Sequence, residues 1–111
     1  MKIVVNYKNK KLEIDAKLVR FWEMGIGLTF KRRGTRNLLF EFYKDCRVAI
    51  TSLFVFFPFL IIWLDEKNNV LEHQVVSPFK FRVIPKKNFR KFLEIPINER
   101  NKEIIGFFVG K

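Results

Sequence analysis

Cysteine and histidine are scarce in this sequence, and their scarcity excludes several kinds of site. Of the 111 residues, one is cysteine, Cys46, and one is histidine, His73. A single cysteine cannot form an internal disulfide or supply a cysteine-rich zinc site. A single histidine leaves no His-pair metal motif, and no glycine-rich phosphate-binding loop is present. The sequence therefore predicts no metal site and no cofactor, and no motif marks a catalytic residue.

The N-terminal segment lacks the apolar stretch of a secretory signal. The continuous apolar run before Asn6 is only three residues long, 3–5. A secretory signal needs an apolar core of about 7–15 residues and a cleavage site of small residues. We therefore expect a cytoplasmic protein in which Cys46 stays reduced.

Acidic residues are also few, so the chain is strongly basic. Eleven Asp and Glu residues against 22 Lys and Arg residues give a formal net charge of +11. A positive field of this size favours a nucleic acid, an anionic membrane or an acidic protein as partner. The alternative is that the charge serves solubility alone, in a chain with 14 phenylalanines.

What the chain does contain is a strand-forming pattern in one domain, 1–111. Apolar residues make up 49% of it, enough for a buried core. Residues 3–7 and 11–15 are expected to pair as a hairpin around a polar turn. Further strands are expected at 38–42, 48–56, 59–64, 70–76, 79–84, 92–95 and 107–109. The predicted fold class is α+β with β dominant: an antiparallel sheet curled into a small partial barrel, with two short helices.

The first of these helices is expected at 16–24. Asp15 would cap its N-terminus, and Leu18, Trp22 and Ile26 would share one side of it. Trp22 is therefore expected to pack into the core. The second helix is expected at 98–105, capped by Asn98 and ended by Gly106.

The segment 48–64 contains no charged residue, which leaves two interpretations open. Its seventeen residues approach the length of a membrane-spanning helix. However, its β-branched and aromatic residues favour strands, and Pro58 would interrupt a helix. We predict two buried strands that meet at Pro58, and the alternative is a membrane-associated protein inserted through 48–64.

Two stretches of the chain carry several basic residues and contain no acidic residue. The residues predicted to bind a polyanion are Lys31, Arg32, Arg33 and Arg36 in the first, and Lys80, Arg82, Lys86, Lys87, Arg90 and Lys91 in the second. Basic groups neutralise phosphates, and the phenylalanines interleaved in the second stretch could stack on bases. The alternative is plain alternation along a strand, with Phe directed inward and Lys or Arg outward. The predicted partner is a nucleic acid or another polyanion, bound by a non-enzymatic domain.

The rival hypothesis is a hydrolase acting on a phosphate-bearing substrate. Asp65, in an expected turn, and His73, in the expected strand 70–76, are its candidate residues. Within that strand, Leu71, His73 and Val75 are expected to face the core. The aspartates lie apart in different turns, which does not suggest a two-metal nuclease.

A series of short motifs resembles one known family. In order, these motifs are GLTF at 27–30, LLFEF at 38–42, FVFFP at 54–58, IIWLD at 61–65, SPF at 77–79, PKK at 85–87 and LEIP at 93–96. Their order and spacing resemble domain of unknown function 192, also called uncharacterised protein family 0127, in its archaeal form. The resemblance implies a small, mostly β, barrel-like domain with no established activity.

The chain departs from the pattern of that family at several positions. The family usually has a polar residue near Thr51, a methionine near Ser52 and an aspartate where Leu60 stands. It often has glycine where Ile97 and Asn98 stand. If the polar residues of the family form a site, Leu60 removes its clearest carboxylate here.

Overall fold

Strands dominate the computed structural model, which describes residues 1–19, 36–50, 56–79 and 82–110. The strands are β1 (Lys2–Tyr7), β2 (Lys10–Asp15), β3 (Lys17–Val19), β4 (Leu38–Cys46), β5 (Phe59–Leu64), β6 (Val70–Val76) and β7 (Phe89–Pro96). A short 3₁₀ helix (Glu99–Asn101) and the helix α1 (Lys102–Val109) follow. The predicted α+β class with β dominant is confirmed.

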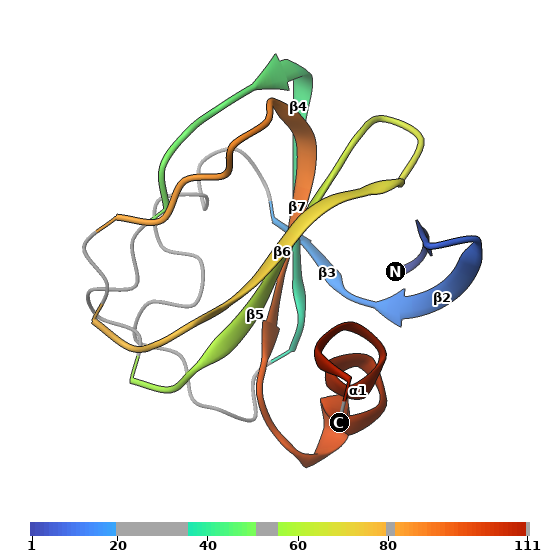
Figure 1. Cartoon of the computed structure of the whole chain (residues 1–111), viewed down its shortest axis with the longest axis vertical. Coiled ribbons are helices and arrows are strands. Elements are labelled where there is room, and N and C mark those ends of the chain that lie inside the picture. The colour runs from blue at the N-terminus through green and yellow to red at the C-terminus, as the bar shows by residue number, and fades with distance from the viewer. Residues whose placement is uncertain (20–35, 51–55, 80–81, 111) are drawn as a thin grey trace.

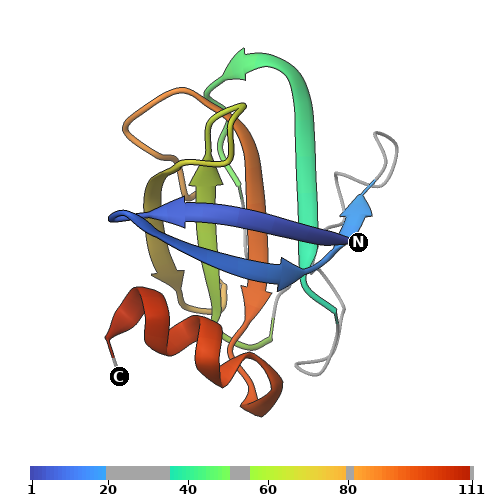
Figure 2. The ribbon, with the colours of Figure 1, turned by 90° about the vertical axis from the view of Figure 1, so that its right-hand side faces the viewer.

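The described strands form two sheets that pack as layers. One sheet is the β1–β2 hairpin, and the other has the strand order β3-β4-β7-β5-β6. The hairpin crosses one face of the five-stranded sheet, and α1 lies beside it on the same face (Figures 1 and 2). Among the described residues the strands do not close into a barrel. The sheet is antiparallel as expected except for the parallel pair β3–β4.

The hairpin forms where the sequence predicts it, with a two-residue turn. Tyr7 pairs with Lys10, which leaves Lys8 and Asn9 as the two central residues. Their φ angles are 51° and 65°, as a type I′ turn requires. Asparagine tolerates this left-handed conformation better than most residues. The turn places the lysines of the hairpin tip on the surface.

The buried strand predicted at 59–64 is confirmed as β5, and its burial explains the uncharged run. All six of its side chains are buried, because both faces of the sheet are covered. The first core cluster contains Phe40, Phe59, Ile61, Trp63, Phe89 and Phe92 on one face. The second contains Val5, Ile14, Leu39, Leu60, Ile62, Leu93 and Phe108, between the sheet, the hairpin and α1. No described helix is long and apolar enough to cross a membrane.

Two other predicted strands are not formed by their described residues. In 48–56, Ile50 makes an isolated antiparallel bridge with Val83, and 51–55 lie outside the described residues. In 79–84, Phe79 adopts a φ of 65° at a turn, and 80–81 are not described. A positive φ breaks the extended conformation of a strand at Phe79, and between the described residues of the two segments the pairing is the one bridge of Ile50 with Val83.

The helix predicted at 16–24 is wrong for its described residues. Lys17–Val19 form β3, which runs parallel to the start of β4. The N–H of Lys17 donates to the carbonyl of Asn37 at 2.8 Å, so pairing with β4 satisfies backbone groups that a helix would satisfy internally. Trp22 and its predicted packing lie outside the described residues.

The C-terminal helix begins later than predicted and continues past its expected end. Asn98 is a cap, but of the 3₁₀ helix Glu99–Asn101, where its side chain accepts a hydrogen bond from the N–H of Asn101, and α1 begins at Lys102. Gly106 lies within α1, and the chain leaves the helix at Gly110, whose φ of 83° suits a glycine C-cap. The strand predicted at 107–109 is therefore wrong. Phe108 is buried against the hairpin from the helix, and this tertiary contact overrides the strand preference of Phe and Val.

Candidate functional site

A shallow depression of about 370 Å³ lies beside the single histidine. Its lining comes from three parts of the chain: Tyr7 at the end of β1, the residues 70–73 of β6, and Lys86 and Lys87 in the turn before β7. These segments are far apart in sequence, so the depression exists only in the folded chain.

Glu72 fixes the turn that carries the two lysines. Its Oε2 atom accepts hydrogen bonds from the backbone N–H groups of Lys86 and Lys87, each at 2.8 Å. The negative charge of Glu72 is thus met by two backbone dipoles rather than by the ammonium groups. Both lysine side chains stay exposed.

Tyr7 and His73 form a hydrogen-bonded pair at the other side of this depression. The Tyr7 hydroxyl lies 3.1 Å from Nε2 of His73, and the ring of Phe108 packs near both. Burial lowers the pKa of His73, and the nearby Lys8 ammonium lowers it further. The imidazole is therefore neutral at neutral pH, and the geometry fits a Tyr7 hydroxyl that donates to Nε2.

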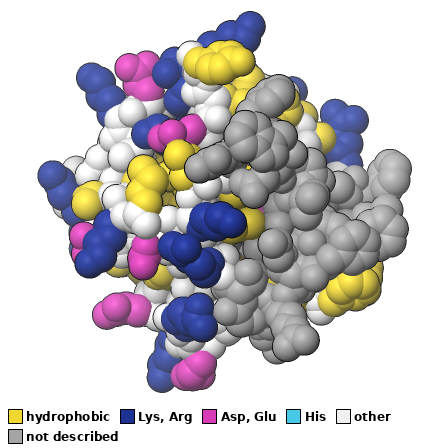
Figure 3. Space-filling view, turned by 180° about the vertical axis from the view of Figure 1, so that it is seen from behind, with side chains coloured by type: hydrophobic (Ala, Val, Ile, Leu, Met, Phe, Trp, Pro, Cys, Tyr) yellow, Lys and Arg dark blue, Asp and Glu magenta, His cyan; other side chains and the backbone are white. Residues whose placement is uncertain are grey.

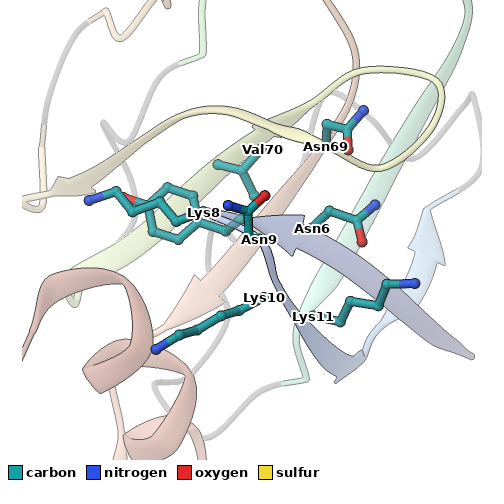
Figure 4. Close-up of a pocket in the computed structure, with 8 residues that line it drawn as sticks. Asn6, Lys8, Asn9, Lys10, Lys11, Asn69 and Val70 are labelled. Carbon is teal, nitrogen blue, oxygen red and sulfur yellow. The ribbon is translucent and has the colours of Figure 1, made fainter.

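A second depression, of about 490 Å³, adjoins the first at the tip of the hairpin (Figure 4). Tyr7 and Val70 line both. The other lining residues are Asn6, Lys8, Asn9, Lys10, Lys11 and Asn69. The two depressions together bring five lysines to one continuous surface, which we call the lysine surface: Lys8, Lys10, Lys11, Lys86 and Lys87.

The members of the lysine surface keep their charges available. Among the residues that the structure describes, no carboxylate forms an ion pair with any of the five. The ammonium of Lys8 lies 5.2 Å from the centre of the Tyr7 ring, a cation–π distance that leaves the charge in place.

Two of the predicted polyanion-binding residues are instead neutralised by acids from other elements. Arg90 pairs with Asp45 at 3.2 Å and with Glu66 at 3.5 Å. Lys91 pairs with Glu41 at 3.6 Å. On the left half of the face shown in Figure 3, the described Lys and Arg side chains likewise lie among Asp and Glu side chains. A stretch without acids in the sequence is therefore not free of acids in the fold.

The remaining predicted residues divide between exposed and undescribed positions. Arg36 and Arg82 are exposed, and neither lines the two depressions. Lys31, Arg32, Arg33 and Lys80 lie outside the described residues. The interpretation of 8–10 as a plain turn and of Lys11 as the first residue of a strand missed these three lysines as binding residues: Lys8, Lys10 and Lys11. Three lysines within four residues at a hairpin tip, with no acid among them, were a usable signal.

The two candidate residues of the hydrolase hypothesis, Asp65 and His73, do not line a common depression. Asp65 accepts hydrogen bonds from the N–H groups of Lys67 and Asn69, both at 2.9 Å, and thereby closes the β5–β6 turn. It does not line the depression beside His73. Over the described ranges, no group of three His, Cys, Asp or Glu residues could hold a metal ion.

Burial raises the pKa of the Cys46 thiol, which makes this thiol less reactive.

Comparison with known proteins identifies the fold but no family. Neither profiles of known protein families nor curated proteins give a match. A crystal structure of a protein of unknown function from Novosphingobium aromaticivorans is similar, with a TM-score of 0.75 and 14% identity over 93% of this chain and 76% of that one. A candidate transcription regulator from Sinorhizobium meliloti is also similar, with a TM-score of 0.74 and 13% identity over 91% of this chain and 81% of that one.

Proposed function

We propose that this protein is a non-enzymatic binding domain that holds a polyanionic partner on its lysine surface. The observation that carries the proposal is the convergence on two adjoining depressions of five lysines that form no ion pair with any described carboxylate. Attraction to such a surface is mainly electrostatic, and it needs no catalytic group. The structural likeness to a candidate transcription regulator is compatible with a nucleic acid as one such polyanion.

We also propose that the chain is an archaeal-type member of domain of unknown function 192. Three of the motifs behind that resemblance lie on β4, β5 and β7, the central strands of the five-stranded sheet. The strand-rich fold is of the kind that the resemblance implies.

The test is a fluorescence anisotropy titration of the full chain with three labelled polyanions: mixed-sequence DNA, RNA and polyglutamate. At about 50 mM salt, where electrostatic contacts are strong, at least one of them should bind. For duplex DNA, the logarithm of the affinity should fall with the logarithm of salt concentration by about 0.9 per phosphate neutralised.

Matched variants locate the binding surface. Lys10→Ala/Lys11→Ala and Lys86→Ala/Lys87→Ala each remove two positive charges from the lysine surface. Lys17→Ala/Lys44→Ala removes two exposed charges from β3 and β4, at the other side of the sheet. The first two variants should weaken binding and flatten the salt dependence more than the third. Equal weakening in all three, or no binding by the unaltered protein, would overturn the proposal.

A further inference from the structure

We infer that the polyanion of the lysine surface is an acidic peptide segment in extended conformation, which pairs with the outer edge of β6. This inference rests on the proposed function, since it names the class of partner that the same surface holds. It adds backbone recognition to the electrostatic attraction.

The first observation is an edge strand with unpaired backbone groups. β6 ends the strand order of the five-stranded sheet and pairs with β5 alone. Among the described residues, no backbone group outside β5 bonds to the backbone of residues 71–76. Every second residue of such a strand directs its N–H and C=O away from the sheet, where another strand can bind them.

The second observation is that the depression beside His73 opens over this edge. Glu72 lies opposite Trp63 and His73 lies opposite Ile62, so their side chains point to opposite faces of the sheet. A depression lined by both residues must therefore span the edge between the two faces. Tyr7 borders it from one face, and the turn of Lys86 and Lys87 borders it from the other.

The charges around the edge select an acidic segment. Lys86, Lys87 and Lys8 lie along the two depressions, whereas the carboxylate of Glu72 is bound by two backbone N–H groups. Farther along the same strand, Val75 is 44% exposed and offers an apolar contact to alternate side chains of an added strand. A second copy of this chain would bring like charges together, which disfavours edge-to-edge pairing between copies.

The aromatic residues of the surface favour a peptide over a nucleic acid. Single-stranded nucleic acids bind by stacking bases on open aromatic faces. The ring of Tyr7 is surrounded by the Lys8 ammonium, by Phe108 at 5.1 Å and by His73 at 5.4 Å. It therefore offers little room for a base, while the open strand edge offers what a peptide backbone needs.

The test uses a fluorescein-labelled peptide of alternating glutamate and valine, about eight residues long, as is usual for a strand. Two further peptides carry N-methyl groups on all valines or on all glutamates. N-methylation removes the backbone N–H, and only every second residue of an added strand directs its N–H toward β6. One methylated peptide should therefore bind at least about tenfold more weakly than the parent, and the other should bind as well as the parent. Equal binding of all three peptides, or equal loss in both methylated ones, would contradict strand addition.

Protein variants test the role of the two lysines at the edge. Lys86→Ala/Lys87→Ala should weaken binding of the parent peptide by about five- to tenfold, the range expected for two exposed ion pairs. The charge-matched Lys17→Ala/Lys44→Ala should change it less than about twofold. Equal weakening in both variants would overturn the assigned site.

Single-stranded DNA of the same charge, titrated in parallel, separates this inference from the proposed function. Binding of DNA without binding of the peptide would overturn the inference and leave the proposed function standing. Failure of both probes, together with failure of polyglutamate, would overturn the two together. In that case Lys86 and Lys87 would serve only to protect the edge of β6 from unwanted pairing.

Discussion

At the scale of single residues, carboxylates shape this protein by binding backbone N–H groups. Asp65 closes the β5–β6 turn, and Glu72 holds the turn before β7. Burial alone would raise the pKa of Asp65, but the hydrogen bonds from Asn69 and Lys67 outweigh it and lower the pKa. Both side chains therefore have structural roles, and that of Glu72 also positions the lysines of the proposed site.

His73 should make the stability of the protein depend on pH. Its pKa in the folded chain lies below the ordinary value of 6.5, which the unfolded chain retains. As the pH falls past 6.5, the unfolded state takes up a proton that the folded state does not, so the free energy of unfolding decreases. The decrease should level off once the pH passes the lowered pKa.

Urea denaturation from pH 8 to pH 5 measures this dependence, with His73→Gln as the variant and Tyr7→Phe as the control. These pH values bracket the ordinary histidine pKa of about 6.5. His73→Gln should lack the part of the decrease that begins near that pH, while Tyr7→Phe keeps the titrating imidazole and should retain a decrease. Identical pH profiles for His73→Gln and the unaltered protein would contradict the assignment.

At the scale of elements, Phe108 is the most deeply buried apolar side chain of the C-terminal helix, and Ile104, Ile105 and Phe107 pack partly buried against the same cluster. Phe108 is 6% exposed and belongs to the second core cluster, whereas its neighbour Val109 is 48% exposed. α1 is only eight residues long, and a helix this short needs packing to form. The largest part of that packing comes from the contact of Phe108 with the second core cluster.

Replacing this anchor should destabilise the whole domain. Phe108→Ala should lower the free energy of unfolding by about 3–5 kcal/mol, because it opens a cavity under α1. Val109→Ala, at the exposed neighbouring position, should change it by less than about 0.5 kcal/mol. Thermal and urea denaturation followed by circular dichroism measures both, and a similar small effect in the two variants would mean that α1 is not anchored there.

At the scale of the whole molecule, the five-stranded sheet has a core on both of its faces. Leu60 is fully buried in the second core cluster, at the position where the family of the resemblance usually has an aspartate. In this chain the surroundings of Leu60 are apolar side chains, which cannot compensate a buried carboxylate.

Leu60→Asp should therefore lower the free energy of unfolding by at least about 4 kcal/mol, from lost burial and an uncompensated carboxyl group. Leu60→Met keeps the volume and should cost less than about 1.5 kcal/mol. Denaturation with urea measures both. A Leu60→Asp protein as stable as the unaltered one would show that polar partners can reach this position.

The sequence by itself determined the strands whose patterning is local. Alternation, turn residues and an uncharged run are properties of neighbouring residues. They predicted the hairpin, β5, β6 and the residues 92–95 of β7. The net charge likewise predicted a basic surface. Within these strands the expected direction of one side chain is wrong: Val75, expected in the core, is exposed, whereas its neighbour Val76 is buried. The irregular register between β5 and β6 lies at the other end of β6, between the pairs Leu64–Val70 and Trp63–Glu72, where it interrupts the expected alternation of Leu71 with His73.

Only the tertiary structure decided which segments pair and which charges remain available. Residues 17–19 became a strand because β4 offers them backbone partners, and 107–109 stayed helical because Phe108 packs on the hairpin. Arg90 and Lys91 met acids from other elements, while the lysines of the hairpin tip met none among the described residues. Local patterns set the preference of each segment, but contacts between distant segments decide where a preference is overridden and which charges are left to bind a partner.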